Sequence, residues 1–454
     1  MKGSNMRLSL HIALILCSAA SGTLRAQWLD TTLATGAGSC ALCYNSTNDK
    51  VYCANGGENT VSIIDGATNE VIATVPTGSG PRDLCYNPVN NKVYSANHGD
   101  STVTVIDGAG DSAIATVIVG SYPWVLCYNP AGNRVYCANS GGSSVSVIDG
   151  TSNNVDATVP VGMWPEVIGC NPTDNKVYCV STSTDSVYVI GGASNDVIAT
   201  LPAGGIPTAL CWNPHSDKVY CVNSGDNTVT VINGASDHVL ATDTVGYAPT
   251  AIACDSADNK VYCANTGDTT VTVIDGANNN VIGTIATMWD PGALCHNRIN
   301  NKLYCARPSY GYVTVIDCAS DSVIRTIHLN GESPNPCAFT WNPLENRVYV
   351  ADREQGSVAV FRDSMSGVEE GRPPSAPRPT LCAGPTVVRN MLSLPQAPGR
   401  ELRATLLNTL GRSVLDLHPG ANDVGQLAPG VYFVCPQSAT GTGQPAVTRV
   451  VVTK

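Results

Sequence analysis

The motif Lys/Arg-Val/Leu-Tyr recurs through most of this chain at a nearly constant spacing. Its tyrosines stand 42 residues apart six times in succession and 45 residues apart the seventh time. A fixed period of this length indicates one supersecondary unit stacked many times, because a single unit cannot bury its own apolar surface. The repeated tyrosines are Tyr52, Tyr94, Tyr136, Tyr178, Tyr220, Tyr262, Tyr304 and Tyr349.

Each unit contains four short apolar runs separated by turn residues. In the third unit these runs are 112–120, 125–129, 134–139 and 144–149. Alternation such as Val145 and Val147 against Ser144 and Ser146 favours strands over helices. Four antiparallel strands in about 40 residues are typical of a propeller blade. The amphipathic helices of a helical solenoid and the Gly-His and Trp-Asp pairs of WD40 repeats do not occur in these units.

The two ends of the repeat array complement each other. Residues 29–36 match the run 71–78 that follows the Ile-Asp-Gly turn, whereas the last unit stops after 357–361 without such a run. We therefore expect the N-terminal strand to complete the last blade and close the ring. The predicted fold is an all-β propeller of eight four-stranded blades, with seven blades as the alternative count.

The repeated blocks carry a family resemblance. Val-Tyr-Cys-Ala-Asn at 51–55, Thr-Val-Thr-Val-Ile-Asp-Gly at 102–108 and Val-Ile-Ala-Thr-Val-Pro-Thr-Gly at 71–78 resemble YVTN-type β-propeller repeats, with Cys-Ala in place of Val-Thr. The resemblance covers residues 27–363. It implies a propeller, commonly of seven blades, in a family whose members are mostly extracellular or periplasmic and bind varied ligands.

The N-terminus has the order of a secretory signal peptide. Lys2 and Arg7 precede an apolar run at 8–20, and small and polar residues follow at 21–26. The run is shorter than the ~20 residues that span a bilayer, which disfavours a membrane anchor. A lipoprotein signal at Cys17 is a second alternative, disfavoured by the bulky Leu16 before it. We expect residues 1–26 to be removed, with no transmembrane helix left.

After the repeats, composition changes twice. A Pro-rich segment at 364–380 predicts an extended linker. Residues 381–454 contain strand-like runs at 402–407, 414–417, 431–434 and 449–452, which predict a small β-sandwich.

Three blocks of this tail carry a second resemblance. The blocks 407–414, 427–433 and the terminal Val-Val-Thr-Lys resemble the type A C-terminal sorting domain of the type IX secretion system, although Asn390-Met stands in place of the usual Asn-Pro. The resemblance implies the secretion machinery as a partner and a secreted or surface-attached protein. An ordinary accessory sandwich is the alternative.

The net charge limits which classes of partner the protein can bind. The chain carries −11, and removing 1–26, which holds three basic residues and no acids, takes the charge to −14. An acidic surface without a Lys/Arg cluster argues against nucleic acid. No Cys-x-x-Cys occurs, and the seven histidines share no repeat position, so we predict neither a metal site nor a cofactor.

Many of the 19 cysteines recur at fixed repeat positions. Four pairs flank a hairpin turn symmetrically, so disulfides across the hairpin are one hypothesis. Small apolar core residues that substitute for Val are the other, because further units replace one member of the pair. The candidate pairs are Cys43 with Cys53, Cys127 with Cys137, Cys211 with Cys221, and Cys295 with Cys305.

The aspartate of Ile-Asp-Gly also recurs, at Asp65, Asp107, Asp149 and Asp275 among others. We expect its carboxylate to accept backbone N–H bonds and fix a turn. A calcium site is the alternative, and each loop offers few oxygen ligands for it.

Variation is concentrated on one face. Antiparallel geometry puts the loops between the second and third strands, and between the fourth strand and the next unit, on the same side, which we call the variable face. The loops entering each unit there are 79–82, 121–124, 163–166, 205–207, 247–249, 288–291 and 332–336. Exposed Trp, Tyr and Arg suit partner binding. The candidate ligand-binding residues are Arg82, Tyr122, Trp124, Trp164, Glu166, Tyr247, Trp289, Asp290 and Arg307.

For function, the sequence favours a non-catalytic binding or scaffold module that engages an extracellular protein, peptide or glycan through the variable face. The alternatives are a structural component of the cell envelope and a propeller enzyme of lactonase or dehydrogenase type. No catalytic motif stands out, and Glu166, Asp290, His98, Arg82 and Arg307 are the loop residues able to contribute to catalysis. The tryptophans have an alternative role as plugs of the ring centre or covers of blade edges.

Overall fold

A computed structural model describes residues 27–287, 290–329, 331 and 333–363, and in the tail 386–388, 391–394, 403–407, 413–418, 420–424, 426–427, 430–437 and 448–452. The expected signal peptide and linker lie outside these residues. The chain divides into two compact units, Met1–Glu369 and Glu370–Lys454. Within the described residues, no helix has the length and apolar character needed to cross a bilayer.

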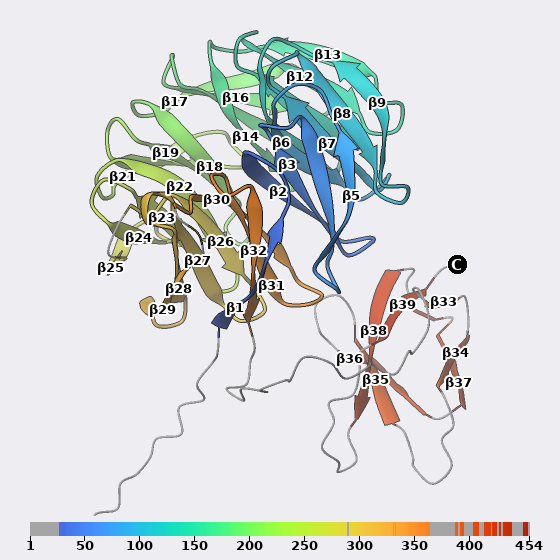
Figure 1. The fold of residues 1–454 in the computed structure, drawn as a ribbon. Coiled ribbons are helices and arrows are strands. Elements are labelled where there is room, and N and C mark those ends of the chain that lie inside the picture. Colours follow the sequence, from blue (N-terminus) through green and yellow to red (C-terminus); the bar gives the residue numbers. More distant parts are fainter. Residues whose placement is uncertain are drawn as a thin grey trace, which may run out of the picture. The chain divides into compact units, whose positions relative to one another are not determined.

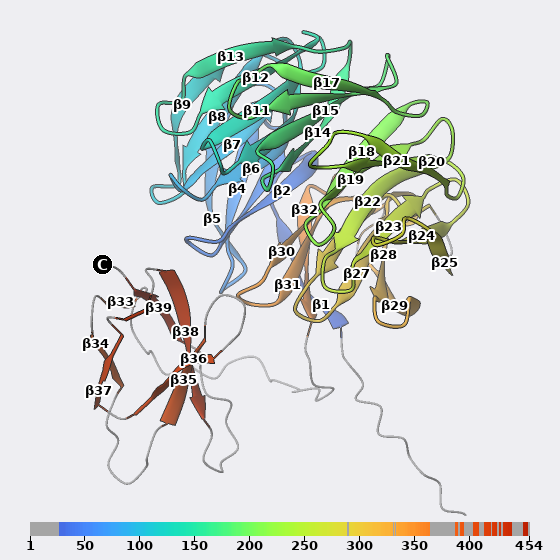
Figure 2. The same cartoon turned by 180° about the vertical axis from the view of Figure 1, so that it is seen from behind.

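The described part of the first unit forms eight four-stranded antiparallel sheets arranged around a ring, which confirms the predicted count (Figure 1; Figure 2). The first strand of each blade is innermost, and neighbouring first strands contact each other around the ring. These innermost strands are β2 (Ser39–Asn45), β6 (Pro81–Asn87), β10 (Pro123–Asn129), β14 (Pro165–Asn171), β18 (Pro207–Asn213), β22 (Pro249–Asp255), β26 (Ala293–Asn297) and β30 (Pro336–Asn342).

The second strands carry the Lys/Arg-Val-Tyr motif. They are β3 (Lys50–Asn55), β7 (Lys92–Asn97), β11 (Arg134–Asn139), β15 (Lys176–Ser181), β19 (Lys218–Asn223), β23 (Lys260–Asn265), β27 (Lys302–Arg307) and β31 (Arg347–Asp352). The third strands are β4 (Thr60–Asp65), β8 (Thr102–Asp107), β12 (Ser144–Asp149), β16 (Ser186–Gly191), β20 (Thr228–Asn233), β24 (Thr270–Asp275), β28 (Tyr312–Asp317) and β32 (Ser357–Asp363). A 3-10 turn, η1 (Pro308–Tyr310), precedes β28.

The fourth strands are outermost and exposed. They are β5 (Glu70–Pro76), β9 (Ser112–Ile118), β13 (Val155–Pro160), β17 (Val197–Pro202), β21 (Val239–Thr244), β25 (Val281–Ala286) and β29 (Ser322–His328). The eighth blade takes its fourth strand from the N-terminus. Strand β1 (Gln27–Ala34) pairs antiparallel with β32, so the expected ring closure is confirmed.

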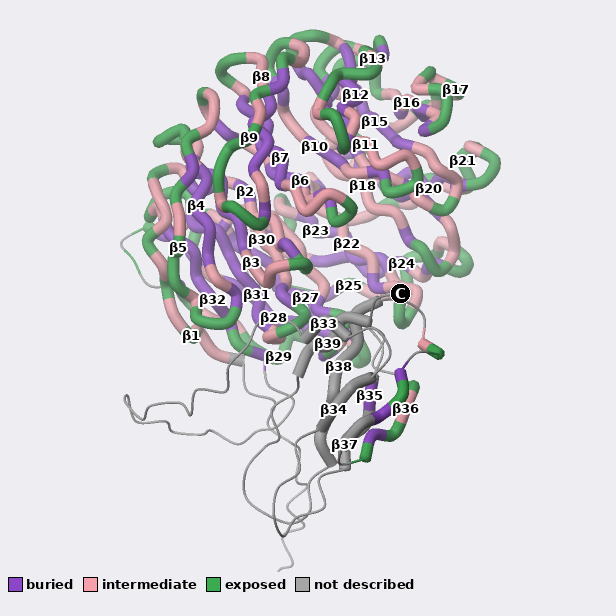
Figure 3. The backbone as a smooth tube through the Cα atoms, turned by 90° about the vertical axis from the view of Figure 1, so that its right-hand side faces the viewer, coloured by how far each residue is buried: buried purple, intermediate pink, exposed green. Residues whose placement is uncertain are grey.

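The core lies between the blades. Both faces of the second and third strands pack against neighbouring blades, so these strands are buried almost throughout, while outer strands such as β9 are largely exposed (Figure 3). All eight motif tyrosines are nearly or fully buried. One cluster joins Cys85, Val103 and Val105 of the second blade to Leu126 and Val135 of the third. Because each cluster spans two blades, no blade has a core of its own.

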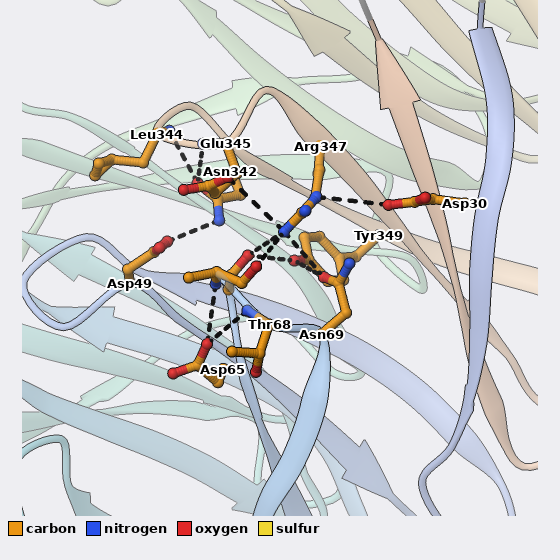
Figure 4. A network of polar contacts seen from close by, with 12 residues as sticks. Asp30, Asp49, Asp65, Thr68, Asn69, Asn342, Leu344, Glu345, Arg347 and Tyr349 are labelled. Carbon is orange, nitrogen blue, oxygen red and sulfur yellow. Dashed lines mark hydrogen bonds and ion pairs between the residues drawn. The ribbon is translucent and has the colours of Figure 1, made fainter. Parts of the chain in front are cut away.

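The cation of the repeated motif ties each blade to the next. Lys176 Nζ donates to the carbonyl of Gly234 at 2.7 Å and to Asp237 Oδ2 at 2.9 Å. Equivalent contacts are made by the first residue of the other second strands except Lys302, which pairs with Asp363. At the closing junction, Arg347 donates to the carbonyls of Gly66 and Ala67 (Figure 4). In every blade but the seventh, the motif therefore holds the third-to-fourth-strand turn of the following blade.

The repeated aspartate fixes that turn, as expected. Asp65 Oδ1 accepts the backbone N–H groups of Ala67 at 3.0 Å and Thr68 at 2.8 Å. The asparagine that ends each innermost strand acts similarly, since Asn45 Oδ1 accepts the N–H of Thr47 at 2.9 Å. These Asx turns explain both repeats without a bound ion.

The hairpin disulfides, one of the two hypotheses for the repeated cysteines, do not form in the structure. Register places Cys43 opposite Tyr52 and Leu42 opposite Cys53, so the hairpin pairs are offset by one residue, and Cys43, Cys53, Cys127, Cys137, Cys221, Cys295 and Cys305 are free thiols. Cys211 instead bonds to Cys254 of the next blade, with Cα atoms 6.4 Å apart. The symmetric spacing was misleading because neighbouring residues of a strand point to opposite faces.

The described part of the second unit is also made of strands. A five-stranded sheet has the order β33 (Thr386–Val388), β39 (Thr448–Val452), β38 (Gly430–Gln437), β35 (Arg403–Leu407) and β36 (Ser413–Leu417). A two-stranded sheet pairs β34 (Met391–Leu394) with β37 (Gly420–Asp423). The four tail strands predicted from the sequence correspond to β35, β36, β38 and β39.

Candidate functional site

Large apolar side chains stand at the tips of the loops that enter the third, fourth and fifth blades. Tyr122, Trp164 and Ile206 are 54%, 61% and 58% exposed, with φ values of 53°, 53° and 52°. The second blade has Gly80 at this position, with φ of 62°. A left-handed conformation costs a bulky L-residue about 1–2 kcal/mol. The blades therefore accept strain at positions where they present apolar surface to solvent.

The adjoining loop supports each tip. The N–H of Ser140 donates to the carbonyl of Tyr122 at 2.9 Å, and the N–H of Gly141 donates to that of Ser121 at 3.1 Å. A Cβ at Gly141 would lie only 2.3 Å from the Tyr122 ring, so glycine there lets the ring lie over the loop. The tip is thereby held in place while much of its ring remains exposed.

An arginine and aromatic side chains gather beside the Tyr122 tip. The guanidinium carbon of Arg82 lies 3.3 Å from the centroid of the Trp124 ring. His98 lies 5.0 Å from the Tyr122 ring and 5.1 Å from the Trp124 ring, between centroids. We call Arg82, Asp83, His98, Tyr122 and Trp124 the Arg82 cluster.

Blade-to-blade comparison shows why this cluster is confined to one sector. Arg82, Trp124 and Glu166 follow the residue that opens the innermost strands of the second, third and fourth blades. The other blades have smaller residues at the same place. Those residues are Cys40, Thr208, Thr250, Gly292 and Cys337.

Burial and charge set the protonation of the cluster. Burial lowers the pKa of Arg82, and the charge of Arg353 acts in the same direction. Burial raises the pKa of Glu166, partly offset by the charge of Arg82. Burial and Arg82 together lower the pKa of His98, which is therefore neutral at pH 7. The cluster thus combines a partly desolvated cation with an aromatic face and a neutral imidazole.

Asp83 is a member of the cluster that the sequence analysis missed. Its Oδ2 accepts the backbone N–H of Leu126 from the next blade at 2.7 Å. Burial raises the pKa of Asp83 to about 6, with hydrogen bonds and Arg82 acting in the opposite direction. Aligning the repeats would have singled it out, since the other blades carry Ala or Val here: Ala41, Val125, Val167, Ala209, Ala251, Ala293 and Ala338.

The remaining candidates do not join this cluster. Tyr247 is 63% exposed at another loop of the variable face. Asp290 Oδ2 accepts the N–H of Ser309 at 3.2 Å and so holds a loop of the seventh blade. Trp289 lies outside the described residues.

Arg307 was wrongly predicted as a surface contact. Its side chain is 1% exposed, and its guanidinium carbon lies 5.0 Å from the Tyr312 ring centroid. It lies at the end of the second strand, at a position where most blades bury an asparagine. The sequence alone did not show that this position faces inward.

A separate open groove of about 430 Å³ lies at the loops of the seventh and eighth blades. It is lined by Pro308, Ser309, Tyr310, His328, Gly331, Ser333, Pro334, Asn335 and Glu354. None of the sequence-predicted candidates lines this groove.

The described residues offer no connected acid–base set among the candidates. No hydrogen bond or ion pair joins His98, Glu166 and Asp290 to one another in the part of the chain that the structure describes. General acid–base chemistry requires groups within hydrogen-bond reach of the reacting atoms. The arrangement is suited to stacking and charge recognition.

A comparison of the sequence with protein-family models finds no match, and a comparison with curated protein sequences also finds none. Solved structures do match. Sqt1 of Saccharomyces cerevisiae has a TM-score of 0.63 at 12% identity, over 74% of this chain and 99% of that one. Hydrazine synthase of Kuenenia stuttgartiensis has a TM-score of 0.50 at 17% identity, over 66% of this chain and 97% of that one. At these identities the likeness shows the fold alone, a β-propeller. In this chain the propeller has eight blades.

Proposed function

We propose that this protein is a non-catalytic binding or scaffold module that engages an extracellular protein, peptide or glycan through the variable face of its propeller. The observation that carries the proposal is the Arg82 cluster, together with the exposed tips Tyr122, Trp164 and Ile206 on the same face. Arg82, Trp124 and Glu166 stand where the other blades carry smaller residues.

The chemistry of this sector suits a ligand with a flat or apolar face and a charged or hydroxyl group. Aromatic rings and arginine bury much area with little loss of side-chain entropy and are enriched at binding hot spots. Stacking of Arg82 on Trp124 pre-orients the guanidinium, which reduces the entropy lost on binding. Asp83 and Glu166 add acceptors close to that cation.

The proposal places the protein outside the cell. Its support is the signal-like N-terminus, the YVTN-type repeats and the tail blocks that resemble a type IX sorting domain. Removal of residues 381–454 should then leave the protein in the periplasm of its host, whereas removal of an internal blade loop should not. Unchanged export of the truncated chain would count against the type IX route.

Two other functions are weaker. A purely structural role in the envelope does not explain strained apolar tips on one sector. An enzyme would need a convergent acid–base set, and the candidates for it stand in separate contacts.

The proposal is tested by capture of ligands from the native culture medium. Immobilised wild-type chain is compared with a variant carrying Trp124→Ala, Trp164→Ala and Trp289→Ala, and with a matched variant carrying Val89→Ala on the opposite face, where Val89 is 64% exposed. We expect the triple variant to lose capture at unchanged thermal stability. Equal capture by the triple variant would reject the variable face as the binding surface.

A further inference from the structure

Three departures from the repeat meet at the junction between the sixth and seventh blades. Asp255 replaces the asparagine that ends the innermost strand in the other blades. Cys318 stands where six blades have glycine directly after the third strand, and His296 stands where Tyr44 stands in the first blade. An oxygen of Asp255, a ring nitrogen of His296 and Sγ of Cys318 lie within 4.8 Å of one another.

The ordinary junction explains why these replacements converge. Asn213 Nδ2 donates to Asn259 Oδ1 of the following blade at 2.8 Å. A Cβ at Gly276 would lie 2.3 Å from that acceptor oxygen and 2.7 Å from that donor nitrogen. A side chain at the glycine position therefore points into the amide pair. Cys318 puts sulfur at this place, and Asp255 cannot donate as the asparagine does.

Buried polar atoms in the cluster have no hydrogen-bond partner. Asp255 is fully buried and its Oδ2 is unpartnered, and His296, with a 4% exposed side chain, has an unpartnered Nδ1. His296 Nε2 lies 3.1 Å from Asn301 Oδ1 and 3.7 Å from Asp255 Oδ1. A carboxylate oxygen and an imidazole nitrogen are therefore buried close together without a hydrogen-bond partner for either atom.

We propose that Asp255, His296 and Cys318 bind one divalent metal ion of the zinc class, with Asn301 Oδ1 or a water molecule as the fourth ligand. A thiolate, an imidazole and a carboxylate form a mixed S, N and O set that suits tetrahedral zinc. Ligand atoms ~2.0–2.3 Å from such an ion are roughly 3.3–3.8 Å apart, so the distances between the ligand atoms must shorten by up to about 1.5 Å.

Charge and protons balance in this binding step. An ordinary cysteine thiol has a pKa of about 8.5 and is therefore protonated at pH 7. Metal binding forms the metal–sulfur bond and releases that proton to solvent. The dication then neutralises the thiolate and the Asp255 carboxylate. The ion would join the sixth and seventh blades where an amide hydrogen bond joins most others.

The test is zinc content and cobalt binding of the full chain, purified without an affinity tag. We expect about one zinc per chain after dialysis, and a cobalt complex with a thiolate-to-metal charge-transfer band. Asp255→Asn and Cys318→Gly restore residues that other blades carry, so both variants should fold. Each should weaken zinc binding at least ~100-fold. Cys263→Ser is the matched control, since the second blade carries Ser95 at that position, and it should bind as wild type does.

Thermal melting with and without zinc completes the design. Zinc should raise the melting temperature of wild type and of Cys263→Ser, and leave Asp255→Asn and Cys318→Gly unchanged. A wild-type chain that binds no zinc, a cobalt complex without the thiolate band, or variants that bind as tightly as wild type would each overturn the proposal.

Discussion

The guanidinium of Arg82 stacks on the ring of Trp124 from the neighbouring blade, 3.3 Å from its centroid. This contact links the innermost strands of the second and third blades at the variable face. It holds a cation in a fixed position beside exposed aromatic surface, and it is the most specific departure from the repeat in the proposed binding sector.

Separating the charge of Arg82 from its stacking tests this contact. Arg82→Lys keeps the charge but loses the planar fork, whereas Trp124→Phe keeps an aromatic face. We expect Arg82→Lys to weaken ligand capture about tenfold, equivalent to ~1.4 kcal/mol, and Trp124→Phe to weaken it less. Surface plasmon resonance with the captured ligand measures both. Full affinity in Arg82→Lys would show that the stacked geometry is irrelevant to binding.

Asp83 should make stability depend on pH. Its pKa is raised to about 6 in the folded chain, against ~3.9 when unfolded. Between these values the folded state binds more protons, so the free energy of unfolding falls as pH rises from ~4 to ~6 and stays lower above. Asp83→Asn removes this loss while keeping an acceptor for the Leu126 N–H.

Denaturant unfolding at several pH values measures the effect. Asp83→Asn should be more stable than wild type at pH 7 by up to about 3 kcal/mol, and the gain should vanish near pH 4. The exposed Asp196→Asn is the control and should change the free energy of unfolding at pH 7 by no more than ~0.5 kcal/mol. A pH-independent difference for Asp83→Asn would contradict the assignment.

Lys302 and Asp363 form a fully buried ion pair at 2.6 Å, between the seventh and eighth blades. Lys302→Ala leaves the carboxylate buried without its cation and should lower the free energy of unfolding by about 3–5 kcal/mol. Lys92→Ala, at the same repeat position, leaves only neutral acceptors without their donor. It should lower the free energy of unfolding by about 1–3 kcal/mol. Urea unfolding compares them. Equal losses would show that the charge of Asp363 is unimportant.

Disulfides should link blades, not hairpin strands. Peptide mapping of oxidised protein should find Cys211 joined to Cys254, and Cys43 not joined to Cys53. Cys127 and Cys170 have the same separation in sequence, and a hydrogen bond between them and burial raise the pKa of Cys127. We expect this pair to oxidise next.

Reduction measures the contribution of the Cys211–Cys254 bond. Closing a 43-residue separation stabilises by about 4 kcal/mol in the chain-entropy model. Reduced wild type should therefore melt lower, and Cys211→Ala should melt at the reduced temperature under both conditions. A hairpin bridge recovered by mapping would contradict the register of β2 and β3.

The architecture could be predicted because the repeat patterns determine the course of the backbone. The period gives the number of blades, the alternation gives the strands, and the matching ends of the array give the ring closure. Blade count, ring closure and the turn role of Asp65 followed from them. Side-chain partners between blades did not, since residues such as Cys211 and Cys254 meet only once blades are stacked. The wrong placement of Arg307 has the same origin: a loop-end position in the sequence became an inward-facing position in the sheet. Aligning the repeats would have found Asp83, but its burial and its contact with the N–H of Leu126 follow only from the stacking of blades.

The most direct test of the variable face is site-specific photo-crosslinking in native medium. A photoreactive amino acid replaces Tyr122 or Trp164 on the variable face, or Val89 on the opposite face. We predict crosslinks to the same ligand from positions 122 and 164 and none from position 89. Crosslinks from position 89 with none from 122 or 164 would contradict the account.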